Sequence, residues 1–108
     1  MKLPTEIFGE VVVVHTPEEL SDDVAHQLEQ FLTSLERSRV IVEMDSTETL
    51  DSAGLTALLN AQDMLRSLQG DLKISTTNQV NRKILEITRL DQQLEVFDSV
   101  IDAVKSFA

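Results

Sequence analysis

Few side chains in this sequence have the type and spacing that catalysis or metal binding requires. The chain contains no cysteine, and His15 and His26 have no third metal ligand at a suitable spacing. Its three glycines lie far apart and form no phosphate-binding loop. Leu50 stands where the sharp turn of a serine hydrolase needs glycine, two residues before Ser52. We therefore expect no enzymatic activity, no metal and no cofactor, and we expect both histidines to be structural or solvent-exposed.

Ser52 is the residue whose position suggests a functional role. Within Leu50–Leu55 it follows a predicted strand and stands in the first turn of a predicted helix. One interpretation is purely structural, with Asp51 or Ser52 capping the helix. The other gives the serine hydroxyl a function. Gly54 lies inside the same helix, where glycine costs about 1 kcal/mol relative to alanine. Its presence predicts that something approaches the backbone closely at this point.

The elements that position Ser52 alternate between strands and helices. Runs of β-branched and other apolar residues predict the strands. A tight turn at Gly9–Glu10 is expected to pair the first two strands antiparallel. The predicted strands are Thr5–Phe8, Val11–Val14, Arg39–Met44, Leu72–Thr76 and Leu94–Phe97.

Apolar residues spaced three and four apart, together with capping residues, predict four helices. The first begins either at Pro17, after Thr16, or at Asp22, after Ser21, and both starts remain open. Its apolar face holds Leu20, Val24, Leu28, Phe31 and Leu35. The second helix contains Ser52 in its first turn and ends at a cap at Gly70. The third follows Asn78 and carries Val80, Ile84 and Ile87, and the fourth follows Asp98–Ser99 and carries Val100, Val104 and Phe107.

This order predicts an α/β fold in one domain over residues 1–108. The architecture is a mixed, mostly parallel five-stranded sheet with four helices, in the order β-β-α-β-α-β-α-β-α. Functional loops of such sheets lie beyond the carboxyl ends of the parallel strands. Three segments qualify, and we expect them to meet at one edge of the molecule: His15–Ser21, Asp45–Ser52 and Thr76–Asn78.

Charge is distributed unevenly along the chain. Its 19 acidic and 9 basic residues give a formal net charge of −10, and residues 1–36 alone hold eight acids and one base. This balance argues against binding to nucleic acid or to an anionic membrane surface. No apolar run approaches the ~20 residues of a membrane span, and we expect a cytoplasmic protein. The acidic first third either solubilises the surface or steers a basic protein partner.

Two segments together resemble the signature of the STAS domain family, which is typified by bacterial anti-sigma factor antagonists. They are Val40–Asp45 and, after a short polar loop, Asp51-Ser52-Ala53-Gly54-Leu55. Further along, Leu72–Ile74, Val80–Asp91 and Val96–Ser99 are similar to the family's fourth strand, third helix and last strand. The resemblance extends over essentially the whole chain.

The resemblance implies a non-enzymatic regulatory protein. In that family the matching serine is phosphorylated by a partner that is both an anti-sigma factor and an ATP-dependent kinase. The unphosphorylated form binds this partner and releases the sigma factor, and a metal-dependent serine phosphatase resets the phosphorylated form. By this resemblance Ser52 is the phosphoacceptor. The implied partner-binding surface comprises Leu20, Ser21, Asp22, Asp51, Ser52, Ala53, Gly54, Leu55, Thr77 and Asn78.

The sequence departs from the family pattern in several places, including a short N-terminal hairpin and Ala53, where a second hydroxyl is frequent. Glu18-Glu19-Leu20-Ser21 stands where many members have Gly-x-Leu-Asp, which bears on the choice of partner, and Arg89 stands where glycine is common. Two other roles within the family stay open. One is an accessory subunit of a membrane transport complex of the lipid-transport ATPase type, and the other is a stress-complex scaffold. A small hydrolase that uses Ser52 with a histidine has the weakest support.

Overall fold

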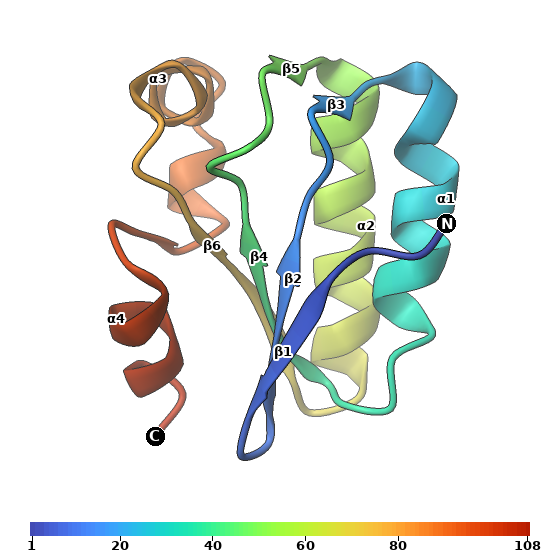
Figure 1. Ribbon diagram of the computed structural model, residues 1–108, viewed down its shortest axis with the longest axis vertical. Helices are drawn as coiled ribbons and strands as arrows, with labels where there is room; N and C mark the ends of the chain where they lie inside the picture. The colour runs from blue at the N-terminus through green and yellow to red at the C-terminus, as the bar shows by residue number, and fades with distance from the viewer.

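A five-stranded sheet forms the middle layer of the protein, as seen in a computed structural model that describes all 108 residues (Figure 1). The strand order is β1-β2-β4-β6-β7, in which β1 pairs antiparallel with β2 and every other neighbouring pair is parallel. The fold class and the order of these elements are as predicted. The strands are β1 (Thr5–Phe8), β2 (Val11–His15), β4 (Arg39–Glu43), β6 (Asp71–Ser75) and β7 (Val96–Phe97).

The β1–β2 hairpin has the register that the sequence predicts. Thr5 lies opposite Val14 and Phe8 opposite Val11. Gly9 adopts a φ of 63°, a left-handed conformation that glycine tolerates without steric cost. Helices pack on both faces of the sheet at β2, and all four of its valines are buried.

One face of the sheet is covered by the first three helices. Alternate side chains of β2, β4 and β6, including Val14, Val42 and Ile74, pack against them in the main core. On the first helix Leu28 is fully buried, and Val24 and Phe31 pack against the same core, as the spacing predicted. The helices are α1 (Asp22–Thr33), α2 (Ser52–Ser67) and α3 (Gln79–Ile87), and a short 3-10 helix, η1 (Leu90–Gln92), follows.

The opposite face carries the last helix, α4 (Val100–Lys105), at the lower left of Figure 1. Ala103 packs against Val11, Val13 and Ile41, and Val100, Val104 and Phe107 surround this smaller core as predicted. Lys73 lies under the end of the helix: its Nζ donates to Ser106 Oγ (2.8 Å) and lies 4.2 Å from the centre of the Phe107 ring. No helix in the protein combines the length and the apolar character that crossing a membrane requires.

The structure decides between the two predicted starts of α1. The helix begins at Asp22, and Glu19–Leu20 forms a two-residue strand, β3, that pairs in parallel with β5 (Thr49–Leu50). The start after Thr16 is therefore wrong. The Thr16 hydroxyl donates instead to the carbonyl oxygen of Glu43, because this segment runs alongside the end of β4.

Gly70 takes part in the predicted cap, because its N–H group donates to the carbonyl oxygen of Leu65 (2.8 Å), and it has a second role. The α2 helix ends at Ser67, and Gln69, with a φ of 68°, is the left-handed residue that reverses the chain. A Cβ atom at Gly70 would lie only 1.9 Å from the carbonyl oxygen of Ser38. Glycine is required here because two backbone segments approach closely.

The third helix is rotated relative to the face that its apolar residues suggested. Of its three predicted residues only Ile84 packs against the core, and the side chains of Val80 and Ile87 are 64% and 71% exposed. Asn81 and Leu85 face inward instead. The Asn81 side-chain nitrogen donates to two buried carbonyl oxygens, which offsets the cost of burying it, while Oδ1 is buried without a hydrogen-bond partner.

Candidate functional site around Ser52

The three predicted loops meet at the carboxyl ends of the parallel strands, at the top of Figure 1. The N–H group of Thr16 donates to the carbonyl oxygen of Glu43 (3.1 Å), which joins the end of β2 to the end of β4. The N–H groups of Glu48 and Thr49 both donate to the carbonyl oxygen of Glu18 (2.7 and 3.1 Å). The predicted convergence of these segments is confirmed.

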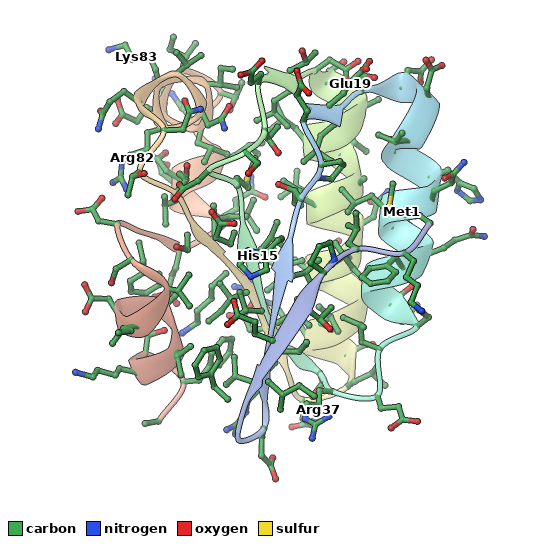
Figure 2. All side chains as sticks on the ribbon, viewed as in Figure 1. Met1, His15, Glu19, Arg37, Arg82 and Lys83 are labelled. Carbon is green, nitrogen blue, oxygen red and sulfur yellow. The ribbon has the colours of Figure 1, made fainter.

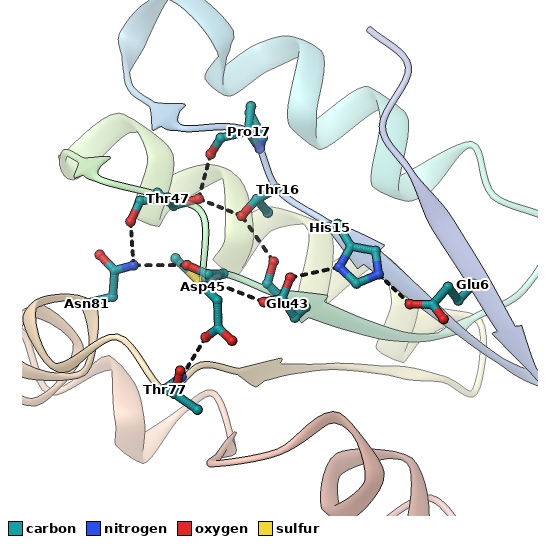
Figure 3. A network of polar contacts seen from close by, with 10 residues as sticks. Glu6, His15, Thr16, Pro17, Glu43, Asp45, Thr47, Thr77 and Asn81 are labelled. Atoms are coloured by element: carbon teal, nitrogen blue, oxygen red, sulfur yellow. Dashed lines mark hydrogen bonds and ion pairs between the residues drawn. The ribbon is translucent and has the colours of Figure 1, made fainter.

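Thr47 links all three loops (Figure 3). Its buried hydroxyl lies 2.6 Å from the Pro17 carbonyl oxygen and 2.6 Å from the Thr16 hydroxyl oxygen. Its carbonyl oxygen accepts a hydrogen bond from the Asn81 side chain (2.8 Å). The segment that leads to Ser52 is therefore held from both sides, by the loop after β2 and by α3. The sequence did not indicate Thr47 and Asn81, because contacts 30 to 34 residues apart leave no local pattern.

Asp45 ties the same segment to the loop after β6. Its Oδ1 accepts a hydrogen bond from the N–H group of Thr77 (2.6 Å), and its own N–H group donates to Glu43 Oε1 (2.9 Å). Burial by itself would raise the pKa of Asp45, but the hydrogen bonds from Thr77 outweigh burial and hold the pKa below its ordinary value. The ionised carboxylate is thus the form that fastens the two loops.

Ser52 is exposed in the first turn of α2, and Asp51 before it caps two helices at once. Asp51 Oδ1 accepts a hydrogen bond from the N–H group of Gly54 (3.0 Å), the usual contact of an N-cap residue. Asp51 Oδ2 accepts one from the N–H group of Asp22 (3.1 Å), the first residue of α1. Ser21 forms no side-chain cap on α1; its hydroxyl donates to Glu19 Oε1. One carboxylate therefore fixes the starts of both helices beside the serine.

The predicted close approach at Gly54 is made by the chain itself. A Cβ atom at this position would lie 2.3 Å from the carbonyl oxygen of Leu20. The N–H group of Asp51 also donates to that oxygen (3.3 Å). Glycine thus lets β3 lie directly against the first turn of α2, which brings the acidic segment before α1 next to Ser52.

A shallow groove of about 330 Å³ runs from Ser52 between α1 and α2. Ala25, Ala53 and Ala57 line its floor with small side chains, and Thr56 and Asn60 continue the α2 wall beyond Ser52. His26 lines the α1 wall as an exposed side chain, in agreement with its predicted position on the surface of the helix. The serine hydroxyl is therefore open both to the end of the molecule and to this groove.

The predicted site residues lie together, but they differ in access. Asp22, Ser52 and Thr77 are exposed, and Ser21, Asp51, Ala53 and Asn78 are half-buried. Leu20, Gly54 and Leu55 are buried, so their part is to position the surface from below. Asn78 accepts a hydrogen bond from the N–H group of Asn81 (3.1 Å) and thereby caps α3, as predicted.

His15 forms a second polar cluster, which the sequence did not indicate (Figure 3). Its Nδ1 lies 2.8 Å from Glu43 Oε2 and its Nε2 lies 2.6 Å from Glu6 Oε1, so the ring connects β1 to β4 across β2. Burial would lower the pKa of His15, but the hydrogen bonds to Glu43 and Glu6 outweigh burial and raise it. Since carboxylates only accept hydrogen bonds, two such partners favour the imidazolium form. The predicted structural role at a strand end agrees with this placement.

Comparison with known proteins gives a consistent picture. The family model described as the STAS domain matches residues 2–103. A Thermotoga neapolitana protein, provisionally named an anti-sigma factor antagonist, is 22% identical over 106 residues, which cover 94% of each chain.

Three solved structures, of two proteins, have the same fold. An anti-sigma factor antagonist from Mycobacterium paratuberculosis superimposes with a TM-score of 0.84 at 21% identity, covering 97% of this chain and 92% of the other. The anti-sigma factor antagonist SpoIIAA in its unphosphorylated form gives 0.79 at 15% identity, covering 98% and 96%. The phosphorylated form of SpoIIAA, from Bacillus, gives 0.72 at 16% identity, covering 99% and 100%.

Proposed function

The chain belongs to the STAS domain family, and from that membership we propose that it is an anti-sigma factor antagonist regulated by phosphorylation of Ser52. In the unphosphorylated state it binds a partner that is both an anti-sigma factor and an ATP-dependent serine kinase. One observation carries the proposal: the Ser52 hydroxyl is exposed where the three loops meet, next to the Asp51 carboxylate that caps two helices. SpoIIAA, which has the same fold, was solved in unphosphorylated and phosphorylated forms.

The position of Ser52 suits a switch that changes an interface and leaves the fold intact. Phosphorylation joins Ser52 Oγ to the γ-phosphorus of ATP and breaks the bond to ADP, and the hydroxyl proton passes to a base of the kinase. The product carries roughly −1.5 to −2 charges. Because the side chain is exposed, water can solvate this charge in the free protein. A partner packed on the same turn would have to bury it, at a large cost in free energy.

In this proposal the chain supplies a binding surface and a phosphoacceptor, and other proteins supply the catalysis. The kinase transfers the phosphoryl group, and a metal-dependent serine phosphatase removes it. The Ser52 hydroxyl forms no hydrogen bond to a carboxylate or a histidine, and the carboxylate of the neighbouring Asp51 is engaged by two backbone N–H groups. We place the protein in the cytoplasm, where sigma factors and ATP are found.

Phosphorylation with a purified candidate kinase tests the proposal directly. The protein is incubated with the kinase and ATP, and the modified residue is mapped by mass spectrometry. We expect one phosphoryl group on Ser52, full labelling of Thr56→Ala and none of Ser52→Ala. Thr56 is a matched control because its exposed hydroxyl lies one helical turn further along α2. Labelling of Ser52→Ala would contradict the assignment.

Binding measurements test the switch itself. Ser52→Asp should bind the kinase more weakly than wild type, whereas the neutral Ser52→Asn should retain more affinity. Equal affinities of the Asp and Asn variants would argue against a charge-based switch. Isolation of the protein with a membrane transport ATPase, or in a large multi-subunit particle, would favour the other roles open to the family.

A further inference from the structure

The outer side of α3 is an apolar surface that no other part of the chain covers. Val80 and Ile87 are 64% and 71% exposed, and Ile84 lies between them at the margin of the core. Their spacing of four and three residues places them in one stripe along the helix. Lys83, also exposed, borders this stripe. Exposed apolar residues that are grouped on one helix face, rather than scattered, mark interaction surfaces.

This stripe lies at the same end of the molecule as Ser52. In Figure 2, Lys83 extends from the top of α3 and Glu19 lies at the same end, beside the start of α1. The position of α3 relative to the Ser52 segment is fixed by hydrogen bonds. Asn81 donates to the carbonyl oxygens of Met44 and Thr47 (3.1 and 2.8 Å), and Asn78 also donates to that of Thr47 (3.4 Å). The position of the stripe relative to the segment that leads to Ser52 is therefore fixed.

The two parts of this surface differ in charge: the segment before α1 is acidic, and the apolar stripe of α3 is bordered by one unpaired base, Lys83. Glu18, Glu19, Asp22 and Asp23 precede or begin α1 without any base among them, whereas α3 carries Arg82 and Lys83 against one acid, Glu86. Arg82 is paired with Asp98 (2.6 Å), while Lys83 forms no ion pair. A binding partner that covers both the acidic segment before α1 and the apolar stripe of α3 must therefore present two chemically different patches.

We propose that the outer face of α3, formed by Val80, Lys83, Ile84 and Ile87, is a second contact area for the protein that docks at Ser52. The inference rests on the proposed function. That partner presents apolar side chains with a carboxylate beside them to α3, and basic side chains to the acidic segment before α1. A second copy of this chain is a poorer fit, because each copy carries a net charge of −10 and the two would repel.

Site-specific photo-crosslinking in the native cell tests this arrangement. A photoreactive residue is placed at Ile87 on α3, at Asp22 in the groove beside Ser52, or at Ile101 on α4. Ile101 is the matched control because it is an apolar residue with a similar exposed fraction, 63%, on the opposite face of the sheet. We expect Ile87 and Asp22 to crosslink to the same protein, and Ile101 not to do so.

The other outcomes separate the inference from the proposed function. Crosslinking at Asp22 but not at Ile87, or to two different proteins, would overturn the inference and leave the proposed function intact. Crosslinking of Ile87 to a second copy would overturn it in favour of self-association. A shared partner that does not phosphorylate Ser52 would support the common surface and contradict the proposed function. No crosslinking at Asp22 would contradict both.

The affinity between this chain and the purified partner that crosslinking identifies then measures the contribution of α3 to binding. Val80→Ser/Ile87→Ser should weaken binding about tenfold or more, whereas Ile101→Ser should leave it unchanged. Ile84 is left in place because it packs against the core. Unfolding curves that match wild type exclude a folding defect. If the partner is the kinase, the double variant should raise KM for phosphorylation of Ser52 without lowering kcat. An affinity within twofold of wild type would overturn the inference.

Discussion

Asp51 determines the geometry around Ser52 because its two carboxylate oxygens serve different helices. One oxygen binds the N–H group of Gly54 in α2, and the other binds that of Asp22 at the start of α1. The sequence presented Asp51 and Ser52 as alternative caps of one helix. Only the folded chain shows that Asp51 alone has this role, which leaves the Ser52 hydroxyl available.

Replacement of Asp51 should therefore affect both helices. Asp51→Ala should lower the free energy of unfolding by about 1–2 kcal/mol, because it removes the cap of α2 together with the bond to α1. Asp51→Asn should lose less, since its single amide oxygen can still accept the hydrogen bond from Gly54. Urea unfolding measures both. Equal stabilities of wild type and Asp51→Ala would contradict the shared cap.

His15 should make stability depend on pH in a defined direction. Its pKa in the folded protein lies above the ordinary value of 6.5, so its ionised form stabilises the fold. This contribution is fully present below about pH 6.5 and is lost as the pH rises through the folded-state pKa. The difference in unfolding free energy between wild type and His15→Gln should accordingly shrink from pH 6 to pH 9.

A variant of one carboxylate partner provides the control. In Glu6→Gln one hydrogen-bonding carboxylate is lost while Glu43 remains, so the NMR titration midpoint of His15 should move to lower pH. A stabilising contribution from His15 that grew with pH would show that the imidazolium ion does not connect β1 to β4.

At the scale of elements, the arrangement around Ser52 depends on the strand β3. It has only two residues, yet it pairs with β5 and lies against the first turn of α2 through the gap left by Gly54. The sequence predicts a close approach at Gly54, but its apolar spacing places Leu20 on the face of a helix. Two-residue strands have no periodicity to detect, and their pairing over 30 residues is decided by tertiary contacts.

Gly54→Ala provides a test in which two effects have opposite signs. Helix propensity alone would stabilise the variant by about 1 kcal/mol. The added Cβ, 2.3 Å from the Leu20 carbonyl oxygen, must displace backbone, and overpacking of this kind costs about 1–3 kcal/mol. We expect a net loss of stability, together with weaker binding of the partner. Thr56→Ala on the exposed face of the same helix should not be destabilised in this way.

At the scale of the whole molecule, the uneven charge coincides with the end of the sheet that carries Ser52. Asp22 lines the same groove as Ser52, and Glu18 and Glu19 pair with the segment just before it, whereas Glu10 and Glu36 border a groove at the far end of the sheet. A phosphoryl group on Ser52 would join an edge that is already acidic. The same field would attract a basic partner before phosphorylation.

Partner association should therefore be sensitive to salt. We expect the association rate to fall about tenfold or more between low and high ionic strength, as the Debye length shrinks below about 10 Å. Glu19→Gln/Asp23→Asn should reduce this dependence, whereas Glu10→Gln/Glu36→Gln, with the same change in net charge, should not. Stopped-flow measurements distinguish these cases. If rates do not depend on salt, the acidic edge serves only to keep the protein soluble.

The sequence by itself determined what depends on neighbouring residues. The β-branched runs, the capping residues and the Gly9–Glu10 turn act within a few positions, and they were sufficient for the order of elements, the hairpin register and the exposed serine. Tertiary structure decided the shared cap at Asp51, the rotation of α3 about Asn81 and the ion pairs of His15. Each of these depends on a partner 9 to 37 residues away, and such contacts form only when the sheet brings distant segments together.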